Sequence, residues 1–187
     1  PRPDLLPPAG RGRRRRFKIR PRRYPDPGEA WPGVKTPTGR RETVKDRLPY
    51  DLADAGRLTA EAEAFIAATV EARGAGAVDP RDLVAVLHTS YRRSTLLVDA
   101  PDQATSRATV DTGLAWRRPA DPRRLTMPGR LIVETKGGTA PSPLDRALWT
   151  AGLRPTRVSK YGAGLAALTD LPDLKWHRVL DAHLRPP

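Results

Sequence analysis

Residues 130–168 read RLIVETKGGTAPSPLDRALWTAGLRPTRVSKYGAGLAAL, a strand pattern followed by two helix patterns. The opening RLIVETK alternates apolar and polar residues, which places Glu134 and Lys136 together on one face of a predicted strand. Ser142 then has the features of a helix N-cap, with proline next and an acidic residue three positions on. Residues 157–168 predict a strand end that passes into a short helix.

The segment RRRRFKIRPRRY at 13–24 is strongly basic and alternates from its phenylalanine onward. Alternation favours a strand that carries Lys18, Arg20 and Arg22 on one face, with Pro21 at an edge or a bulge. A solvated basic run is the alternative interpretation. The Pro- and Gly-rich PDPGEAWPG that follows predicts a turn-rich link.

The remaining helices and strands are predicted from the same strand and helix periodicities of the apolar residues. Further strands are predicted at 34–36, 83–97 and 106–115. Helices are predicted at 59–73, where Thr59 can cap the start, and at 175–184.

Several predicted strands carry charged residues on the face opposite their apolar side chains. In the stretch 106–115, for example, Arg107 and Asp111 share one face with a threonine between them. A closed or strongly curved sheet with a polar interior accounts for this pattern. The expected fold class is therefore α+β, an antiparallel β-barrel or tunnel with flanking helices.

The chain has 187 residues, with 34 Lys and Arg against 21 Asp and Glu, so its formal net charge is +13. The excess is local, because residues 1–47 hold 15 of the cations and 5 of the acids. This charge indicates a polyanionic ligand, whether nucleic acid, a membrane surface or a phosphate compound. The absence of Cys excludes disulfides and thiolate metal sites. No apolar run reaches the roughly 20 residues of a membrane span, so a cytoplasmic location is expected.

Few common catalytic patterns are present. His88, His177 and His183 are scattered, which argues against a histidine metal site, and there is no phosphate-binding P-loop. What remains is a set of strands that each present cations on a polar face, together with Glu134, which lies between apolar Val133 and the pair Thr135-Lys136 and which we expect to be buried. A buried carboxylate beside cations needs a partner or a metal. The alternative is that Glu134 and Lys136 form a surface ion pair.

The order of short motifs along the second half of the chain is distinctive. It runs ETK, S-x-x-D-R-x-L-W, a turn, SKY, G-x-A-A-L and K-W-H-R, and it is preceded by RRRRFKIRPRRY, VKTPTGRRETVKDRLPYD, YRRSTLL and SRATVDTGL. These motifs resemble those of the VTC domain, the CYTH-like polyphosphate polymerase domain of the triphosphate tunnel metalloenzyme superfamily. The resemblance covers the whole chain and implies one domain over 1–187, with 1–12 irregular. The resemblance does not include the N-terminal part of the family pattern, so the tunnel is expected to be incomplete at that end.

The resemblance implies a phosphotransferase that moves the γ-phosphate of ATP onto a polyphosphate chain, with Mg or Mn as the metal. The expected ligands are ATP, triphosphate and polyphosphate, while a membrane partner is left open. Lys160 of the SKY motif would be the catalytic lysine, closest to the transferred phosphate, and Glu134 would bind the metal. The cations that the resemblance assigns to phosphate are Lys18, Arg20, Arg22, Lys35, Arg93, Arg107 and Lys136.

One departure from the family pattern keeps other functions open. Family members tend to have Glu immediately before Val-Lys, whereas this chain has Gly33, which cannot bind a metal. A non-catalytic polyphosphate- or nucleotide-binding module is therefore the second hypothesis. Nucleic-acid binding through the basic run 13–23 is the third, but only Phe17 and Tyr24 lie with that run. The run therefore offers few aromatic rings on which bases could stack, and no nucleic-acid partner is expected.

Overall fold

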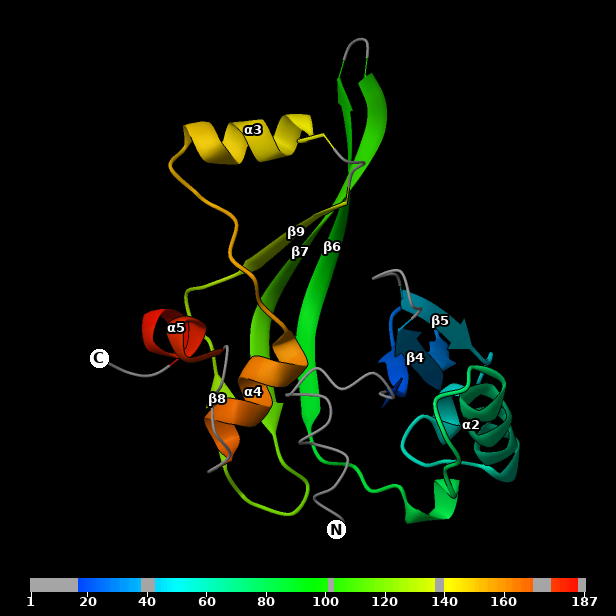
Figure 1. Ribbon diagram of the computed structural model, residues 1–187. Coiled ribbons are helices and arrows are strands. Elements are labelled where there is room, and N and C mark those ends of the chain that lie inside the picture. The colour runs from blue at the N-terminus through cyan, green and yellow to red at the C-terminus, as the bar shows by residue number, and fades with distance from the viewer. Residues whose placement is uncertain (1–16, 38–42, 101–102, 137–139, 170–175, 185–187) are drawn as a thin grey trace. The chain divides into compact units, whose positions relative to one another are not determined.

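The computed structural model describes residues 17–37, 43–100, 103–136, 140–169 and 176–184 (Figure 1). The chain divides into two compact units, Pro1–Val84 and Ala85–Pro187, each with a hydrophobic core. No helix among the described residues is long and apolar enough to cross a membrane.

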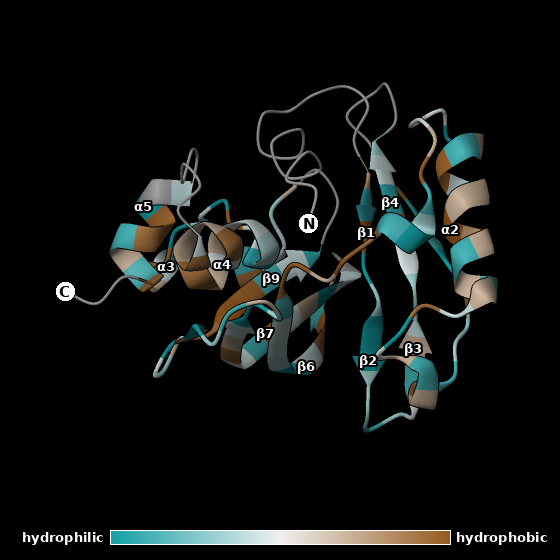
Figure 2. Ribbon diagram, turned by 90° about the horizontal axis from the view of Figure 1, so that it is seen from below, coloured by the Kyte–Doolittle hydropathy of each residue, from teal (hydrophilic) through white to brown (hydrophobic). Residues whose placement is uncertain are grey.

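The first unit contains two small antiparallel sheets and one long helix. Strands β1 (Lys18–Ile19), β4 (Gly33–Pro37) and β5 (Thr43–Arg47) form the three-stranded sheet, in the order β1-β4-β5. Strands β2 (Arg22–Tyr24) and β3 (Glu29–Trp31) form a hairpin, of which β2 is strongly hydrophilic (Figure 2). Helix α2 (Ala60–Ala72) lies between two 3-10 turns, Leu52–Asp54 and Pro80–Asp82.

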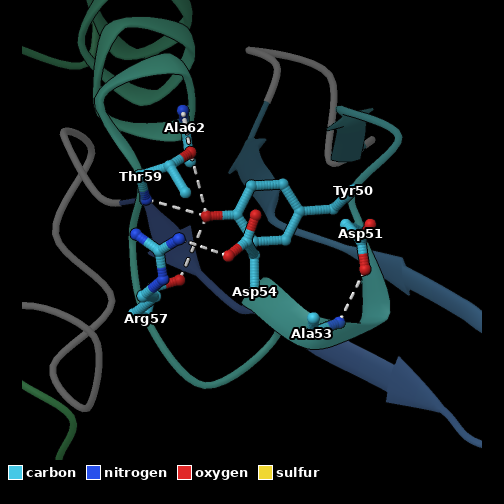
Figure 3. Close-up of polar contacts among 7 residues, drawn as sticks. All are labelled: Tyr50, Asp51, Ala53, Asp54, Arg57, Thr59 and Ala62. Carbon is cyan, nitrogen blue, oxygen red and sulfur yellow. Dashed lines mark hydrogen bonds and ion pairs between the residues drawn. The ribbon is translucent and has the colours of Figure 1, made fainter.

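Helix α2 covers one face of the three-stranded sheet. Ile66 and Val70 on the helix and Val34 on β4 are at most 1% exposed and form the core of this unit. The helix begins at Thr59, whose hydroxyl accepts from the Ala62 N–H. Tyr50 fixes the turn before it, because its hydroxyl accepts from the Thr59 N–H at 2.8 Å and lies 3.1 Å from the Arg57 carbonyl (Figure 3). The opposite face of the sheet is left uncovered by α2.

The second unit is built on a long β-hairpin. Strand β7 (Gln103–Arg117) pairs with β6 (His88–Ala100) along one edge, and with β8 (Arg124–Thr126) and β9 (Ile132–Lys136) along the other. All of these pairs are antiparallel. The helices are α3 (Pro143–Thr150), α4 (Lys160–Leu168) and α5 (His177–Val179), and α5 continues into a π-helical turn, Leu180–Leu184.

A β-bulge in β7 decides which side chains of that strand face α4. Ser90 pairs with Ala115 but Arg92 pairs with Thr112, so β7 has one extra residue at this point, and Gly113 there has φ +60°. The extra residue reverses the alternation, so that Asp111 before the bulge and Trp116 after it both reach α4.

The two glycines of α4 are explained by two indole rings. A Cβ on Gly162 would lie 2.5 Å from Nε1 of Trp176, and a Cβ on Gly164 would overlap the ring of Trp116. Glycine within a helix costs about 1 kcal/mol relative to alanine. Here Gly162 allows close packing of α4 on Trp176, and Gly164 allows close packing on Trp116, which lies in the core of this unit.

The structure confirms an α+β fold with antiparallel sheets, helices over 60–72 and 143–150, and the capping box at Ser142. Within the described residues the strands form open sheets of three, two and four strands and no closed barrel. The prediction of a single domain stays a prediction. The expected irregular N-terminus at 1–12 lies outside the described residues.

Several predicted boundaries were wrong. The basic stretch is not one strand but two, β1 and β2, which join different sheets because the chain leaves the ladder at Arg20-Pro21. The turn-rich link contains β3, and β6 begins at His88 rather than at 83. Residues 157–159 are not a strand.

Candidate functional site

The face of the β1-β4-β5 sheet opposite α2 carries a row of lysines. Lys18 on β1 lies opposite Lys35 on β4, which in turn lies opposite Lys45 on β5. Side chains in a ladder alternate between faces, and the neighbours Val34 and Thr36 are buried beneath the lysines. Like charges placed directly opposite one another repel, so a bound anion would reduce the repulsion between these lysines.

Two arginines extend the row toward the hairpin. Arg20 exchanges backbone hydrogen bonds with Gly33, at 2.8 and 3.2 Å, and Gly33 lies opposite Arg47. We call Lys18, Arg20, Lys35, Lys45 and Arg47 the cationic face. None of the residues that the register places on this face in β1, β4 and β5 is acidic. Asp46 projects from the other face, where it forms an ion pair with Arg73 at 2.7 Å.

The position of Gly33 explains what replaces the glutamate of the family pattern. A Cβ at Gly33 would lie 3.8 Å from a guanidinium nitrogen of Arg22. Arg22, although it belongs to the β2-β3 hairpin, therefore reaches back to the cationic face. A cationic side chain therefore lies near the position at which the family pattern has a glutamate, and glycine itself offers no ligand to a metal.

The second unit holds the one fully buried acidic side chain found among the described residues, Asp111. Both of its oxygens accept from Arg93, with Nε at 2.6 Å and Nη2 at 2.7 Å, and Lys160 Nζ lies 2.7 Å from the second oxygen. The ring of Tyr91 lies beneath both cations, 5.2 Å from Arg93 Cζ and 5.5 Å from Lys160 Nζ. We call Tyr91, Arg93, Asp111 and Lys160 the Asp111 cluster.

Charge and burial compete at Asp111. Burial raises the pKa of its carboxyl, but the hydrogen bonds from Arg93 and Lys160 outweigh burial and leave the pKa below its usual range. The same contact with Asp111 raises the pKa of Arg93. The cluster therefore surrounds one ionised carboxylate with the guanidinium of Arg93 and the amine of Lys160.

Lys160 is positioned by the start of α4. Ser159 caps the helix by accepting from the Gly162 N–H at 3.2 Å, and the Lys160 carbonyl accepts from the Trp116 indole N–H at 2.9 Å. Its side chain is 14% exposed. The packing of α4 on Trp116 thus fixes the backbone from which the ammonium group reaches Asp111.

Strand β9 adds charged side chains to the face that carries the Asp111 cluster. Glu134 lies opposite Thr109, and Lys136 lies opposite Arg107. Lys136 Nζ lies 2.8 Å from the Glu134 carboxylate. This hydrogen bond lowers the pKa of Glu134 against the effect of burial, and the charges of Lys160 and Arg93 lower it further.

Glu134 is not the buried carboxylate that the sequence led us to expect. Its side chain is 49% exposed and forms an ion pair with Lys136, as the alternative interpretation holds, whereas Asp111 is buried. The Thr109 hydroxyl is also buried on this face, and it has no hydrogen-bond partner in the described part of the chain. An incoming ligand with acceptor oxygens could satisfy that hydroxyl.

The predicted site residues divide between the two units. Lys18, Arg20, Arg22 and Lys35 belong to the first unit, and the remaining predicted residues belong to the second: Arg93, Arg107, Glu134, Lys136 and Lys160. Sequence reasoning missed Lys45 and Arg47, which the alternation of TVKDR could have revealed. It also missed the roles of Tyr91 and Asp111, because a contact 18 residues away along the chain leaves no local signal.

A family model described as the VTC domain matches residues 4–169. The chain belongs to the VTC domain family. Neither the search of curated proteins nor that of solved structures found a match. The match spans both units of this VTC domain, including the cationic face and the Asp111 cluster, whereas residues 176–184 lie beyond it.

Proposed function

We propose that this VTC domain binds the phosphate chain of ATP and polyphosphate and transfers the γ-phosphoryl group of ATP onto a polyphosphate end. The Asp111 cluster is the main support for this proposal. Arg93 lies on a strand and Lys160 at the start of a helix. Both bind one buried carboxylate, on a face that also carries Glu134. Cations preorganised in this way need no rearrangement when charge develops on a phosphate.

Phosphoryl transfer requires little covalent chemistry from the protein itself. The bond between the γ-phosphorus and the β–γ bridging oxygen breaks, a terminal oxygen of the polyphosphate end bonds to the γ-phosphorus, and ADP leaves. That terminal oxygen is already ionised near neutral pH, so the reaction needs no general base. Lys160 and Arg93 would hold the transferred group.

The residues present fit a divalent metal only in part. Both Asp111 oxygens are engaged, and Glu134 has one oxygen bonded to Lys136. No group of three metal-ligating side chains occurs among the described residues. Mg²⁺ is often held by one or two carboxylates together with substrate phosphates, and Mn²⁺ accepts the same oxygen ligands. Glu134 would then be the protein ligand of an ion that neutralises the phosphates.

A non-catalytic phosphate-binding module is the second candidate, and Gly33 favours it. The cationic face has Arg22 in place of a carboxylate at that position, which suits retention of an anion rather than metal-assisted transfer.

Incubation with ATP and Mn²⁺ or Mg²⁺, followed by a polyphosphate assay, separates the two candidates. We expect polymer from the wild type and a loss of about 100-fold or more in the Lys160→Ala variant, as for removal of one transition-state contact. Arg123→Ala, which removes an exposed turn arginine paired with Asp121, is the matched control. Tripolyphosphate binding without polymer would favour the binding module, and polymer formation insensitive to Lys160→Ala would refute the assignment of Lys160.

A further inference from the structure

An aromatic pair lies at one end of the cationic face. The ring centroids of Tyr24 and Trp31 are 5.0 Å apart with the planes tilted by 59°, and Arg47 Cζ lies 5.5 Å from the centre of the Trp31 ring. Arg47 is itself part of the cationic face. Flat π surfaces therefore border the row of cations within the same unit.

The aromatic pair and the lysines open to the same side of the chain. Between Glu29 and Pro37 the residues Ala30, Pro32, Val34 and Thr36 are buried. Of the residues at the alternate positions, Trp31, Lys35 and Pro37 are at least partly exposed, whereas Gly33 is buried. Trp31 and Lys35 are thus on one side, two alternate positions apart. Two such steps along an extended chain span about 13 Å. That length is comparable to a nucleoside triphosphate from its base to its terminal phosphate.

We propose that Tyr24, Trp31 and Arg47 form a platform for the base of a nucleoside triphosphate whose phosphates lie along the lysine row. This inference rests on the proposed binding of phosphate chains and adds to it a means of telling a nucleotide from an inorganic chain. Stacking on aromatic and guanidinium planes tolerates any base but favours the large π surface of a purine. Tripolyphosphate, which has no base, would use the lysines alone.

Calorimetric titrations of the full chain with ATP and with tripolyphosphate, at one low salt concentration, test the platform. In Trp31→Leu we expect ATP affinity to fall about tenfold, the size of one lost stacking contact. Tripolyphosphate affinity should stay within twofold of the wild type. Trp149→Leu is a matched control, because Trp149 also lies beneath an arginine, Arg154 at 6.0 Å, but in the other unit. It should change neither affinity.

A fluorescence titration guards against misfolding of the leucine variant. Trp31→Phe keeps an aromatic ring in the hairpin, so we expect this variant to keep the fold. ATP should quench the wild-type emission more than that of Trp31→Phe, and tripolyphosphate should not produce this difference. An equal loss of affinity for ATP and for tripolyphosphate in Trp31→Leu, or no loss of affinity for either, would refute the proposed platform. Failure of the wild type to bind tripolyphosphate would instead overturn the proposed function.

Discussion

The cationic face and the Asp111 cluster both gather positive charge on a sheet, but they hold it in different ways. On the cationic face the register aligns Lys18, Lys35 and Lys45, and among the described residues of β1, β4 and β5 no acidic residue shares their face. In the Asp111 cluster a buried carboxylate accepts three charged contacts, and the bulge and α4 bring the partners together. The first arrangement favours occupation by an anion, and the second fixes cation positions before any ligand arrives.

Removal of the buried carboxylate should have the largest effect. In Asp111→Ala, Arg93 and Lys160 lose their common counter-ion while remaining 30% and 14% exposed. We expect the free energy of unfolding in urea to fall by about 3–5 kcal/mol, as for a broken buried ion pair. Arg81→Ala, which breaks an exposed ion pair with Asp79 but keeps the hydrogen bond from the backbone N–H at position 81 to the Asp79 carboxylate, should leave it unchanged within error. Similar losses of unfolding free energy in the two variants would contradict the conclusion that the buried carboxylate of Asp111 stabilises the second unit.

A methyl group on α4 should have the next largest effect. Gly164→Ala places a Cβ into the Trp116 ring, so we expect about 1–3 kcal/mol of destabilisation from overpacking. Gly56→Ala is the control, because a Cβ there would meet nothing within 4 Å. Thermal unfolding measures both variants. If Gly164→Ala is as stable as Gly56→Ala, close packing on Trp116 does not position Lys160.

Acidification should remove part of what Asp111 contributes. Its folded pKa lies below the ordinary 3.8, so the unfolded chain takes up a proton first and stability is lost as the pH falls below about 4 through the folded pKa. Urea unfolding between pH 6 and pH 3 should show this fall, and Asp111→Asn should show a shallower one. Identical slopes in the two proteins would mean that other carboxyls dominate the acid transition.

The smallest effect on stability should come from the cationic face. Lys45→Gln removes one charge opposite Lys35, so the free protein should be as stable as the wild type or slightly more stable. Tripolyphosphate affinity should nevertheless fall severalfold and depend less steeply on salt. Arg81→Gln, on the turn that packs against α2, should alter neither property. A clear loss of stability in Lys45→Gln would show that the row is held by contacts within the protein.

Local patterns predicted most elements and many of the cations. The spacing of Ile66 and Val70 predicted α2, Ser142 predicted the start of α3, and alternation placed Lys35 on an open face. The barrel and the buried Glu134 were expected from the same alternation. Alternation fixes which side chains share a face of one strand, but it does not fix how strands join into sheets or what covers a face.

The sequence by itself determined the family, the strand and helix periodicities and the positions of the cations, because these are local or are carried by motifs. Tertiary structure decided which carboxylate is buried. The extra residue at Gly113 turns Trp116 toward α4, Gly162 and Gly164 let that helix approach the indole rings, and Lys160 then reaches Asp111. Contacts between residues far apart in the chain depend on packing, and no single stretch of sequence encodes them.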